Sequence, residues 1–399
     1  MGGVLGGSLT GILPLIERLD RTRFSPALAL FEAKGIEADM AARGVPVHVL
    51  GGLPRPLAGG QRSRLGRAAV RAADLWQVVR PRAQALAALY RRERPDVVYL
   101  ANGLTSALAG VVAGARCRVP VICHEKGFRR VGPVERFMSR WVDTCICMTG
   151  DIVAHYRHRR VRARRFLTIF DGIDPDAYEA GGGAAIRREL GIPSEAPLVG
   201  IVGHIQGWKG QHVVVEAVAL ARAAVPDLHC LVVGGVHRHG REYAARLPGQ
   251  IAAHGLEGRV ILTGARRDVP ACMDAMDIVL HSSVTPEPFG RVVLEAMALG
   301  RPVIAPREGG PLLMVRDGET GTLVAPRDPG ALADAIVDLV RDPARRAAMG
   351  RAGRARVREV FDIRHHTHAI EALLDDVLGV RPMPAEVGMA ARRRPRLAG

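Results

Sequence analysis

The chain has 399 residues, of which 48% are apolar and 24% are charged, and its formal net charge is +16. This length allows two domains of ordinary size, and the composition is that of a globular α/β protein, which excludes a disordered or fibrous chain. No apolar run is long enough to span a membrane and no secretory signal opens the sequence, so we expect a cytoplasmic protein. The six cysteines lack the paired spacing of zinc sites, and we expect reduced thiols in the core.

Basic residues are concentrated toward the N-terminus. Residues 1–180 hold 28 of the 56 Lys and Arg but only 16 of the 40 Asp and Glu. Arginines cluster at 55–94 and 126–165 with aromatic residues between them, which suits anionic lipid headgroups or a phosphorylated acceptor. An arginine-rich composition spread over solvated faces would explain the same counts. Nucleic acid is the weakest candidate, because no nucleic-acid-binding motif accompanies the charge.

The first part of the chain predicts an α/β domain. A helical segment is expected at 9–19, and a long one at 62–94. A doubly wound domain ordinarily begins with a buried strand, so we expect that a first strand is missing and that Met1 lies downstream of the natural start; a vestigial strand at 3–5 is the alternative. The expected strands are 25–31, 45–50, 96–101, 119–124 and 144–149.

From Leu198 onward, apolar runs of strand length alternate with segments of helical period, which is the pattern of a parallel sheet with crossover helices. Ahead of them, the glycine triplet at 181–183 predicts a linker. Two helices, at 343–360 and 364–378, and an aperiodic tail that we expect to be disordered follow. The expected strands are 198–205, 229–234, 260–263, 277–281 and 302–305, and the expected helices between them are 211–224, 241–254, 269–276 and 289–299.

The segment from Glu287 to Glu295, which reads Glu-Pro-Phe-Gly-Arg-Val-Val-Leu-Glu, is the most informative part of the sequence. It places one carboxylate just before an expected helix and a second one two turns inside it. The amides and the dipole at a helix N-terminus favour an anion such as phosphate, and the two acids can accept bonds from sugar hydroxyls beside it. Because Glu295 interrupts an apolar run, it needs a buried partner; the alternative is a polar residue on an amphipathic helix.

This segment resembles the E-x7-E motif of the retaining nucleotide-sugar glycosyltransferases of family 4, which have the GT-B fold. The resemblance covers nearly the whole chain and is strongest between 198 and 326. It implies an α/β protein with two Rossmann-like, doubly wound domains that face each other across a cleft. The expected parts are an acceptor-binding domain at 1–180, a donor-binding domain at 184–362, a C-terminal helix at 363–380 that returns to the first domain, and a disordered tail at 381–399.

The resemblance also assigns roles to the motif. It implies that Glu287 faces the donor sugar and the reacting centre, while Glu295 accepts bonds from the ribose hydroxyls. The backbone amides of Gly290, Arg291 and Val292 would bind the phosphates. The donor-binding residues that it implies are His204, Lys209, Phe289, Gly290, Arg291, Val292 and Glu295.

The segment 202–210 resembles the diphosphate-binding segment of the family, in which an Arg and a Lys about five residues apart hold the donor. Lys209 matches that Lys and is implied in catalysis, with an ordinary exposed lysine as the alternative. His204 stands where the family has Arg, and a neutral imidazole offers one donor in place of a bidentate guanidinium. Downstream, Gly309 and Gly310 match the paired glycines in the last segment of the family's donor site.

In the first domain, Gly6 and Gly7 resemble the glycine loop that lets the backbone approach phosphate and acceptor. His124, at the end of an expected strand, resembles the catalytic histidine that the family places near the donor sugar; a structural histidine is the alternative. Thr149 and the segment 171–174 fit two further family landmarks, and we interpret both as structural turns.

The resemblance implies transfer of a sugar from a UDP- or GDP-sugar to a hydroxyl acceptor with retention, in the assembly of surface polysaccharide, lipopolysaccharide or glycolipid. It implies no metal and no other cofactor. The expected partners are the nucleotide sugar, a glycan or lipid-linked acceptor, and an anionic membrane surface on its inner face. A GT-B-like sugar-nucleotide epimerase and a catalytically silent nucleotide-sugar-binding protein are alternatives. A Rossmann dehydrogenase is disfavoured, because no G-x-G-x-x-G lies between a strand and a helix with an acid about 20 residues on.

Overall fold

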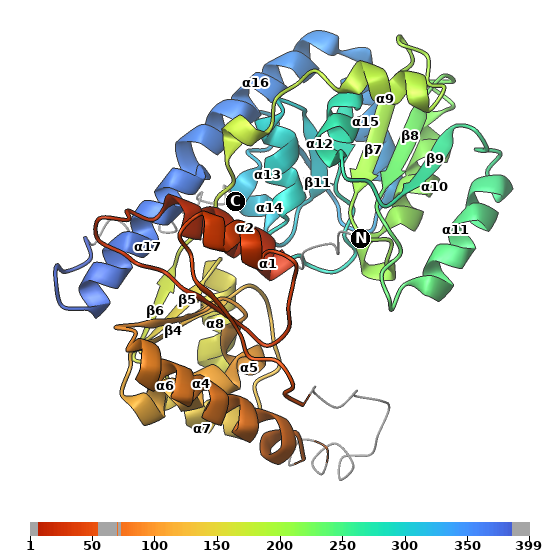
Figure 1. Ribbon diagram of the computed structural model, residues 1–399. Coiled ribbons are helices and arrows are strands. Elements are labelled where there is room, and N and C mark those ends of the chain that lie inside the picture. The colour runs from red at the N-terminus through yellow and green to blue at the C-terminus, as the bar shows by residue number, and fades with distance from the viewer. Residues whose placement is uncertain (1–6, 55–69, 71–72, 385–399) are drawn as a thin grey trace. The chain divides into compact units, whose positions relative to one another are not determined.

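The computed structural model divides the chain into two compact units (Figure 1). Unit 1 combines the residues up to 172 with those from 363 onward, and unit 2 runs from 173 to 362. Both units alternate helices with parallel strands, which confirms the α/β class. The residues that the structure describes are 7–54, 70 and 73–384.

The glycine triplet that was expected to link the domains belongs to the fold of unit 2. The backbone N–H groups of Gly181 and Gly183 each donate a 2.9 Å hydrogen bond to Oδ2 of the buried Asp274. Bonds from N–H groups to a carboxylate are stronger than neutral ones and fix this backbone in place. The structure therefore divides at Gly172, ahead of the boundary expected at residue 180.

Unit 1 contains two parallel sheets among its described strands. One sheet is a pair and the other has four strands in chain order. The five strands that the sequence predicts are present but shorter. A sixth was not predicted, because it begins with Arg165 in a basic run. The strands are β1 (Leu28–Leu30) and β2 (Val47–Val49) in the pair, and β3 (Val98–Leu100), β4 (Val121–Glu125), β5 (Thr144–Cys147) and β6 (Arg165–Thr168) in the larger sheet.

Helices cover the strands of unit 1 through two hydrophobic clusters. In one, Leu15 of α1 and Leu373 of α17 pack with Ile122 of β4 and Ile146 of β5, so the C-terminal helix belongs to unit 1 as the sequence predicts. In the other, α4 and α6 pack on Val98. The helices are α1 (Gly7–Arg18), α2 (Glu37–Ala42), the π-helix η1 (Leu75–Val79), α4 (Arg80–Glu93), α5 (Gly103–Ser106), α6 (Leu108–Cys117), α7 (Pro133–Met138), the 3-10 helix η2 (Ser139–Trp141), α8 (Gly150–His158) and α17 (Ile363–Val377).

Unit 2 is built on a six-stranded parallel sheet with the order β12-β11-β10-β7-β8-β9. The chain begins in the middle at β7, moves outward to β9, and then returns to β10 on the other side of β7. The strand order therefore reverses between β7 and β10, and we call this place the switch point. Its strands are β7 (Leu198–Val202), β8 (His229–Val233), β9 (Val260–Gly264), β10 (Ile278–Leu280), β11 (Val303–Pro306) and β12 (Thr322–Val324).

Helices lie on both faces of this sheet, because successive strand residues point in opposite directions. On β7, Val199 and Ile201 join a core with α10, α11 and α15, while the alternate Gly200 faces Met276 at the end of α12. The sequence missed α15, although Asp328 caps its N-terminus and Pro329 follows, which is a recognised start signal. The helices are η3 (Pro175–Ala177), α9 (Gly183–Glu189), η4 (Gly207–Lys209), α10 (Gln211–Ala221), α11 (Arg241–Ala253), α12 (Val269–Ala275), α13 (Arg291–Ala298), α14 (Pro311–Met314), α15 (Pro329–Arg341) and α16 (Pro343–Val360).

Gly210, between η4 and α10, gives a test of this architecture. Its φ of 74° is left-handed, and a Cβ there would collide with the carbonyl oxygen of Ser282. We expect Gly210→Ala to lower the free energy of unfolding by at least about 2 kcal/mol in urea titrations. The matched control is Gly249→Ala inside α11, where a Cβ meets nothing within 4 Å and alanine favours the helix. Equal stability of the two variants would contradict the close approach.

Candidate functional site

The loops that follow β7 and β10 meet at the switch point of unit 2. In open parallel sheets, ligands bind beyond the carboxyl ends of the strands at this place. The N–H of Val284 donates to the carbonyl oxygen of Trp208 at 2.8 Å, and Ser282 Oγ donates to the carbonyl oxygens of Lys209 and Gly210 at 3.1 and 3.0 Å. The two loops are therefore held together through their backbones.

Lys209 and Glu287 form an ion pair across these loops. The Lys209 Nζ lies 2.9 Å from both carboxylate oxygens of Glu287, and Oε2 also accepts from His281 Nε2 at 2.7 Å and from Ser283 Oγ at 3.0 Å. Both side chains of the ion pair are 15% exposed, so each is fixed but remains accessible to a ligand. The Lys209 ammonium also makes a cation–π contact with the Trp208 ring, whose centroid lies 4.3 Å from Nζ.

The surroundings of Glu287 determine its ionisation. Burial alone would raise the pKa of Glu287, but the hydrogen bonds and positive charge from His281 and Lys209 outweigh it and hold the pKa well below its ordinary value. A carboxylate with so low a pKa is a poor general base at neutral pH. The geometry therefore favours a role in which Glu287 positions Lys209 and accepts hydrogen bonds.

The predicted glycine pair at 309–310 lies directly against the Glu287 segment. The N–H of Gly310 donates to the carbonyl oxygen of Glu287 at 2.8 Å. A Cβ on Gly309 would collide with the Glu287 backbone, and a Cβ on Gly310 would collide with the Phe289 backbone. The Phe289 side chain is only 5% exposed and packs on Phe361, so the ring is a core residue and not a ligand contact. Only its backbone remains available to a donor.

Helix α13 carries the second acid of the motif. It begins at Arg291 after Gly290, whose φ is 90°, so Glu295 lies just over one turn inside the helix and not two as expected. The partner that a buried acid requires is Arg291, whose Nε donates to Glu295 Oε1 at 3.0 Å. Burial raises the pKa of Glu295 although hydrogen bonds from Arg291 and Tyr178 oppose it. Tyr178 was not singled out in the sequence, because no motif contains it.

The remaining predicted donor residues occupy two places. Val292 is half-buried in the first turn of α13, where helix amides have no intrahelical partner. His204 is exposed in the loop after β7, with its ring centroid 5.8 Å from that of His237. The structure thus brings Lys209 and Glu287 into contact and leaves His204 beside a different set of side chains.

His124 lies at the end of β4 in unit 1, where it is 1% exposed. Its Nδ1 is 2.6 Å from the Tyr99 hydroxyl, and its Nε2 is 3.4 Å from Oδ1 of Asp171. The Asp171 Oδ2 accepts from Lys126 Nζ at 3.0 Å, and the ring of His366 stacks on His124 with the centroids 6.0 Å apart. Both ring nitrogens of His124 therefore face protein groups and not solvent.

The contacts within this group of polar side chains determine the charges of His124 and Asp171. Burial lowers the pKa of His124 to about 3, which keeps the ring neutral. Burial opposes ionisation of Asp171, but the charges of Lys126, His124 and His366 outweigh it and hold the pKa of Asp171 well below its ordinary value. Sequence reasoning read Asp171 only as a turn and did not find His366. Strand and helix patterns carry no signal for contacts between segments so distant.

The other predicted landmarks of unit 1 are placed as follows. Thr149 caps α8, where its side chain accepts from the N–H of Ile152. Gly7 is the first residue of α1, and Gly6 lies outside the described residues. No group of three or more His, Cys, Asp or Glu within the described ranges is placed to hold a metal ion.

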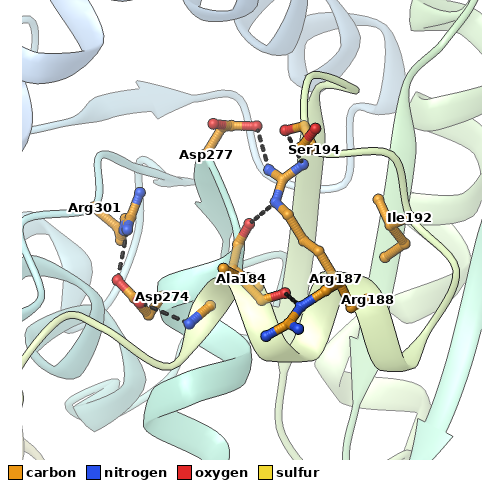
Figure 2. A pocket seen from close by; sticks show the side chains of 10 residues that line it. Ala184, Arg187, Arg188, Ile192, Ser194, Asp274, Asp277 and Arg301 are labelled. Atoms are coloured by element: carbon orange, nitrogen blue, oxygen red, sulfur yellow. Dashed lines mark hydrogen bonds and ion pairs between the residues drawn. The ribbon is translucent and has the colours of Figure 1, made fainter.

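Unit 2 also has a surface hollow of about 450 Å³ that differs from the switch-point site, and Figure 2 shows the side chains that line it. It lies near the amino ends of the strands, since Asp277 directly precedes β10. The Arg187 guanidinium donates to Asp277 and to the carbonyl oxygen of Ala275, and Arg301 pairs with Asp274. These charges neutralise one another, so we do not place the functional site here.

Two Rossmann-like units and an E-x7-E segment at the switch point of the second define a GT-B glycosyltransferase. Residues 6–172 match the family model described as glycosyl transferase 4-like domain, and residues 184–356 match that of glycosyl transferases group 1. The chain therefore belongs to the GT-B glycosyltransferases of the family 4 type. These matches do not favour the epimerase or the silent binding protein.

Among curated proteins, the chain is similar to the D-inositol 3-phosphate glycosyltransferase of Stackebrandtia nassauensis. The two are 36% identical over 184 residues, which make up 45% of this chain and 41% of that protein. The match thus spans less than half the length of this relative.

Two solved structures resemble the whole chain. The Anabaena Alr3699/HepE protein in complex with UDP and glucose is 25% identical with a TM-score of 0.76, and the match covers 94% of this chain and 97% of that one. A glycosyltransferase from Rickettsia africae ESF-5 has a TM-score of 0.78 at 17% identity, with 94% and 96% covered, and supports the fold alone.

The buried histidine predicts a pH dependence of stability. Because the pKa of His124 is about 3 in the folded protein and ordinarily near 6.5, only the unfolded chain takes up this proton between those values, and stability falls as pH falls. We expect the free energy of unfolding of the wild type to fall as pH is lowered from 6.5 to 4, by up to about 1.4 kcal/mol per pH unit more than that of His124→Gln. Urea unfolding at each pH measures this difference. The exposed His158→Gln is the control and should keep the wild-type slope. An unchanged slope in His124→Gln would refute the neutral buried ring.

Proposed function

We propose that this protein transfers a sugar from a UDP-sugar to a hydroxyl acceptor with retention at the anomeric carbon. The observation that carries the proposal is the Lys209–Glu287 pair at the switch point, beside the N-terminus of α13. The preference for UDP over GDP rests on the Anabaena protein, which was solved with UDP and glucose.

The proposed chemistry follows from where the charges lie. The bond between the anomeric carbon and the leaving phosphate oxygen breaks, and the acceptor oxygen bonds to the same face of that carbon. The acceptor proton passes to the leaving diphosphate, which serves as the base, because the low pKa of Glu287 makes that carboxylate a poor one. Lys209 and the first-turn amides of α13 stabilise the charge on the diphosphate, and we assign no metal to the site.

Glu287 and Glu295 have different proposed tasks. When the diphosphate attracts Lys209, Glu287 becomes free to accept a bond from a sugar hydroxyl while His281 and Ser283 keep it oriented. Glu295, which Arg291 and Tyr178 hold in place, accepts bonds from the ribose hydroxyls. One acid thus serves the reacting sugar and the other serves the nucleotide.

We further propose that the acceptor carries a phosphate, either on a small polyol or on a lipid carrier. Residues 1–180 hold a surplus of basic residues, and the curated relative is named for D-inositol 3-phosphate, a phosphorylated polyol. In unit 1, Lys126 is the partly exposed end of the His124–Asp171 chain and presents an ammonium group. A lipid-carried acceptor would place the enzyme in polysaccharide or glycolipid assembly.

A surface of unit 1 supports contact with an anionic membrane. Phe137 at α7 and Trp141 at η2 are 51% and 40% exposed, their rings lie 5.9 Å apart, and Arg140 stacks on Phe137. Exposed aromatic rings among arginines suit the interface of an anionic bilayer. No described helix is both long and apolar enough to cross a bilayer, and the arginines at 62, 64, 67 and 71, to which the sequence points, lie outside the described residues.

The donor site is tested by nucleotide binding and by transfer. In thermal-shift and calorimetric titrations with UDP, GDP, ADP, CMP and NAD, we expect UDP alone to bind strongly. Lys209→Met should weaken UDP binding about 10-fold or more, and Glu295→Gln should weaken it by a similar factor. Glu287→Gln should keep the affinity for UDP, because Lys209 is released to bind it. The same variant should lower the rate of glucose transfer from UDP-glucose to D-inositol 3-phosphate, or the rate of UDP-glucose hydrolysis, about 100-fold.

The control for these variants is Glu308→Gln, which removes an acid paired with Arg327 at the surface and should change neither readout. Equal losses of UDP affinity in the Glu287 and Glu295 variants would refute the division of tasks. If no nucleoside diphosphate binds the wild type, the assignment of a donor site at the switch point is refuted.

The membrane surface is tested by cosedimentation with vesicles. We expect the wild type to bind vesicles that contain phosphatidylglycerol and to bind pure phosphatidylcholine weakly, with binding reduced by salt. The double variant Phe137→Ser and Trp141→Ser should bind the phosphatidylglycerol vesicles with a partition coefficient about 10-fold lower than that of the wild type. Leu220→Ser in unit 2, another exposed apolar residue at 51%, should bind as the wild type does. Unchanged binding of the double variant would exclude this surface.

A further inference from the structure

Two buried side chains at the end of β10 bind the carboxylate of Glu287. His281 directly follows this strand, and its backbone N–H donates to the carbonyl oxygen of Ile304 in β11 at 2.9 Å. The His281 side chain is 3% exposed, and Ser283, two residues further on, is 1% exposed. Both side chains therefore belong to the fixed part of unit 2, at the carboxyl edge of its sheet.

The two carboxylate oxygens of Glu287 have different partners. Oε2 accepts from His281 Nε2 at 2.7 Å and from Ser283 Oγ at 3.0 Å, and Lys209 Nζ also lies 2.9 Å from it. Within the described parts of the chain, Oε1 is bonded by Lys209 alone, again at 2.9 Å. If the Lys209 ammonium turns toward an anion, Oε2 keeps two hydrogen bonds and Oε1 keeps none.

This difference assigns the two oxygens to different tasks. A carboxylate oxygen has about two positions at which it can accept a hydrogen bond. Both positions of Oε2 are used by His281 and Ser283, whereas both positions of Oε1 become available when Lys209 leaves. The Glu287 side chain is 15% exposed, so a ligand can reach it. Oε1 is therefore the oxygen that can accept from a ligand hydroxyl, and the bonds to Oε2 determine where Oε1 points.

The His281 ring makes its contact with the acid through one nitrogen. An ionised carboxylate only accepts hydrogen bonds, so Nε2 carries the proton of the 2.7 Å bond. Nδ1 is buried and has no hydrogen-bond partner among the residues that the structure describes. Nε2 also lies 3.6 Å from the position of a Cβ on Gly290, so the ring contacts the start of α13 as well as the acid.

His281 also acts on the ionisation of Glu287. Burial raises the pKa of Glu287, and the hydrogen bond from His281 comes first among the interactions that lower it, ahead of those from Lys209. When Lys209 turns to a diphosphate, Glu287 therefore keeps the interaction that most favours its ionised form.

We propose that His281, together with Ser283, is a positioning residue that holds Oε2 of Glu287 and so keeps Oε1 available to a hydroxyl group of the donor sugar. This inference rests on the proposed function and adds a residue to the same site. Without His281, the carboxylate would follow the Lys209 ammonium and lose its orientation toward the sugar. Turnover of the sugar therefore depends on His281, whereas affinity for the nucleotide does not.

The test compares His281→Gln with His281→Asn. The amide nitrogen of a Gln side chain can occupy about the position of imidazole Nε2, whereas that of Asn corresponds to Nδ1, which has no partner here. The readout is kcat for glucose transfer from UDP-glucose to D-inositol 3-phosphate, or for UDP-glucose hydrolysis. We expect His281→Gln to stay within about 3-fold of the wild type and His281→Asn to lower kcat about 30-fold. Both variants should keep the affinity for UDP within about 2-fold, because UDP carries no sugar for Glu287 to bind.

Two further variants complete the design. Ser283→Ala removes only the second bond to Oε2 and should lower kcat about 10-fold, and it still tests the inference if circular dichroism shows that His281→Asn does not fold. His229→Asn makes the same change at another buried histidine, at the start of β8 and thus at the opposite edge of the sheet. This control should keep the wild-type kcat and affinity for UDP.

Equal turnover in His281→Gln and His281→Asn would overturn the inference, because Nε2 would then not be the working nitrogen. A loss of UDP affinity as large as the loss of kcat would overturn it too, since His281 would then merely support the loop. Either outcome leaves the donor site intact. If the wild type neither binds UDP nor turns over UDP-glucose, the proposed function itself fails.

Discussion

The approach of the loop after β7 to the loop after β10 is the constraint on which the site of unit 2 depends. Gly210 must have a positive φ and no Cβ, because the carbonyl oxygen of Ser282 occupies that space. This approach brings the Lys209 ammonium onto Glu287, and the ion pair keeps the carboxylate ionised and oriented although it is mostly buried. The ammonium group of Lys209 is therefore preorganised, and in the proposed function it receives the diphosphate of the donor.

Two histidines of this protein lie in opposite surroundings. His124 is buried between Tyr99 and Asp171, where desolvation keeps its ring neutral. His204 is exposed in the loop after β7, with its ring centroid 5.8 Å from that of His237. Burial and neighbouring charge, and not the residue type alone, decide the protonation state of an imidazole such as that of His124.

Sequence reasoning predicted the described strands of both units except β6 and β12, because buried parallel strands are continuous apolar runs and these two strands are only partly buried. It found the helix at 343–360 with the bounds that the structure has, and the E-x7-E segment at its correct place at a helix start. It did not show that the ring of Phe289 is buried, which leaves only its backbone available to a donor, or that the glycine triplet expected as a linker is bound to unit 2. In both cases the spacing was right, but the contacts that fix each role, with Phe361 and Asp274, come from segments that are remote in sequence.

The sequence by itself determined the α/β class, the periodicity of the elements and the identity of the chemical groups at the site, because these depend on local patterns of apolar and polar residues. Only the tertiary structure decided which groups meet. Lys209 contacts Glu287 because the strand order reverses between β7 and β10, and His204 meets His237 because β7 pairs with β8 on its other side. Strand order is set by packing of the whole sheet, and no local pattern encodes it.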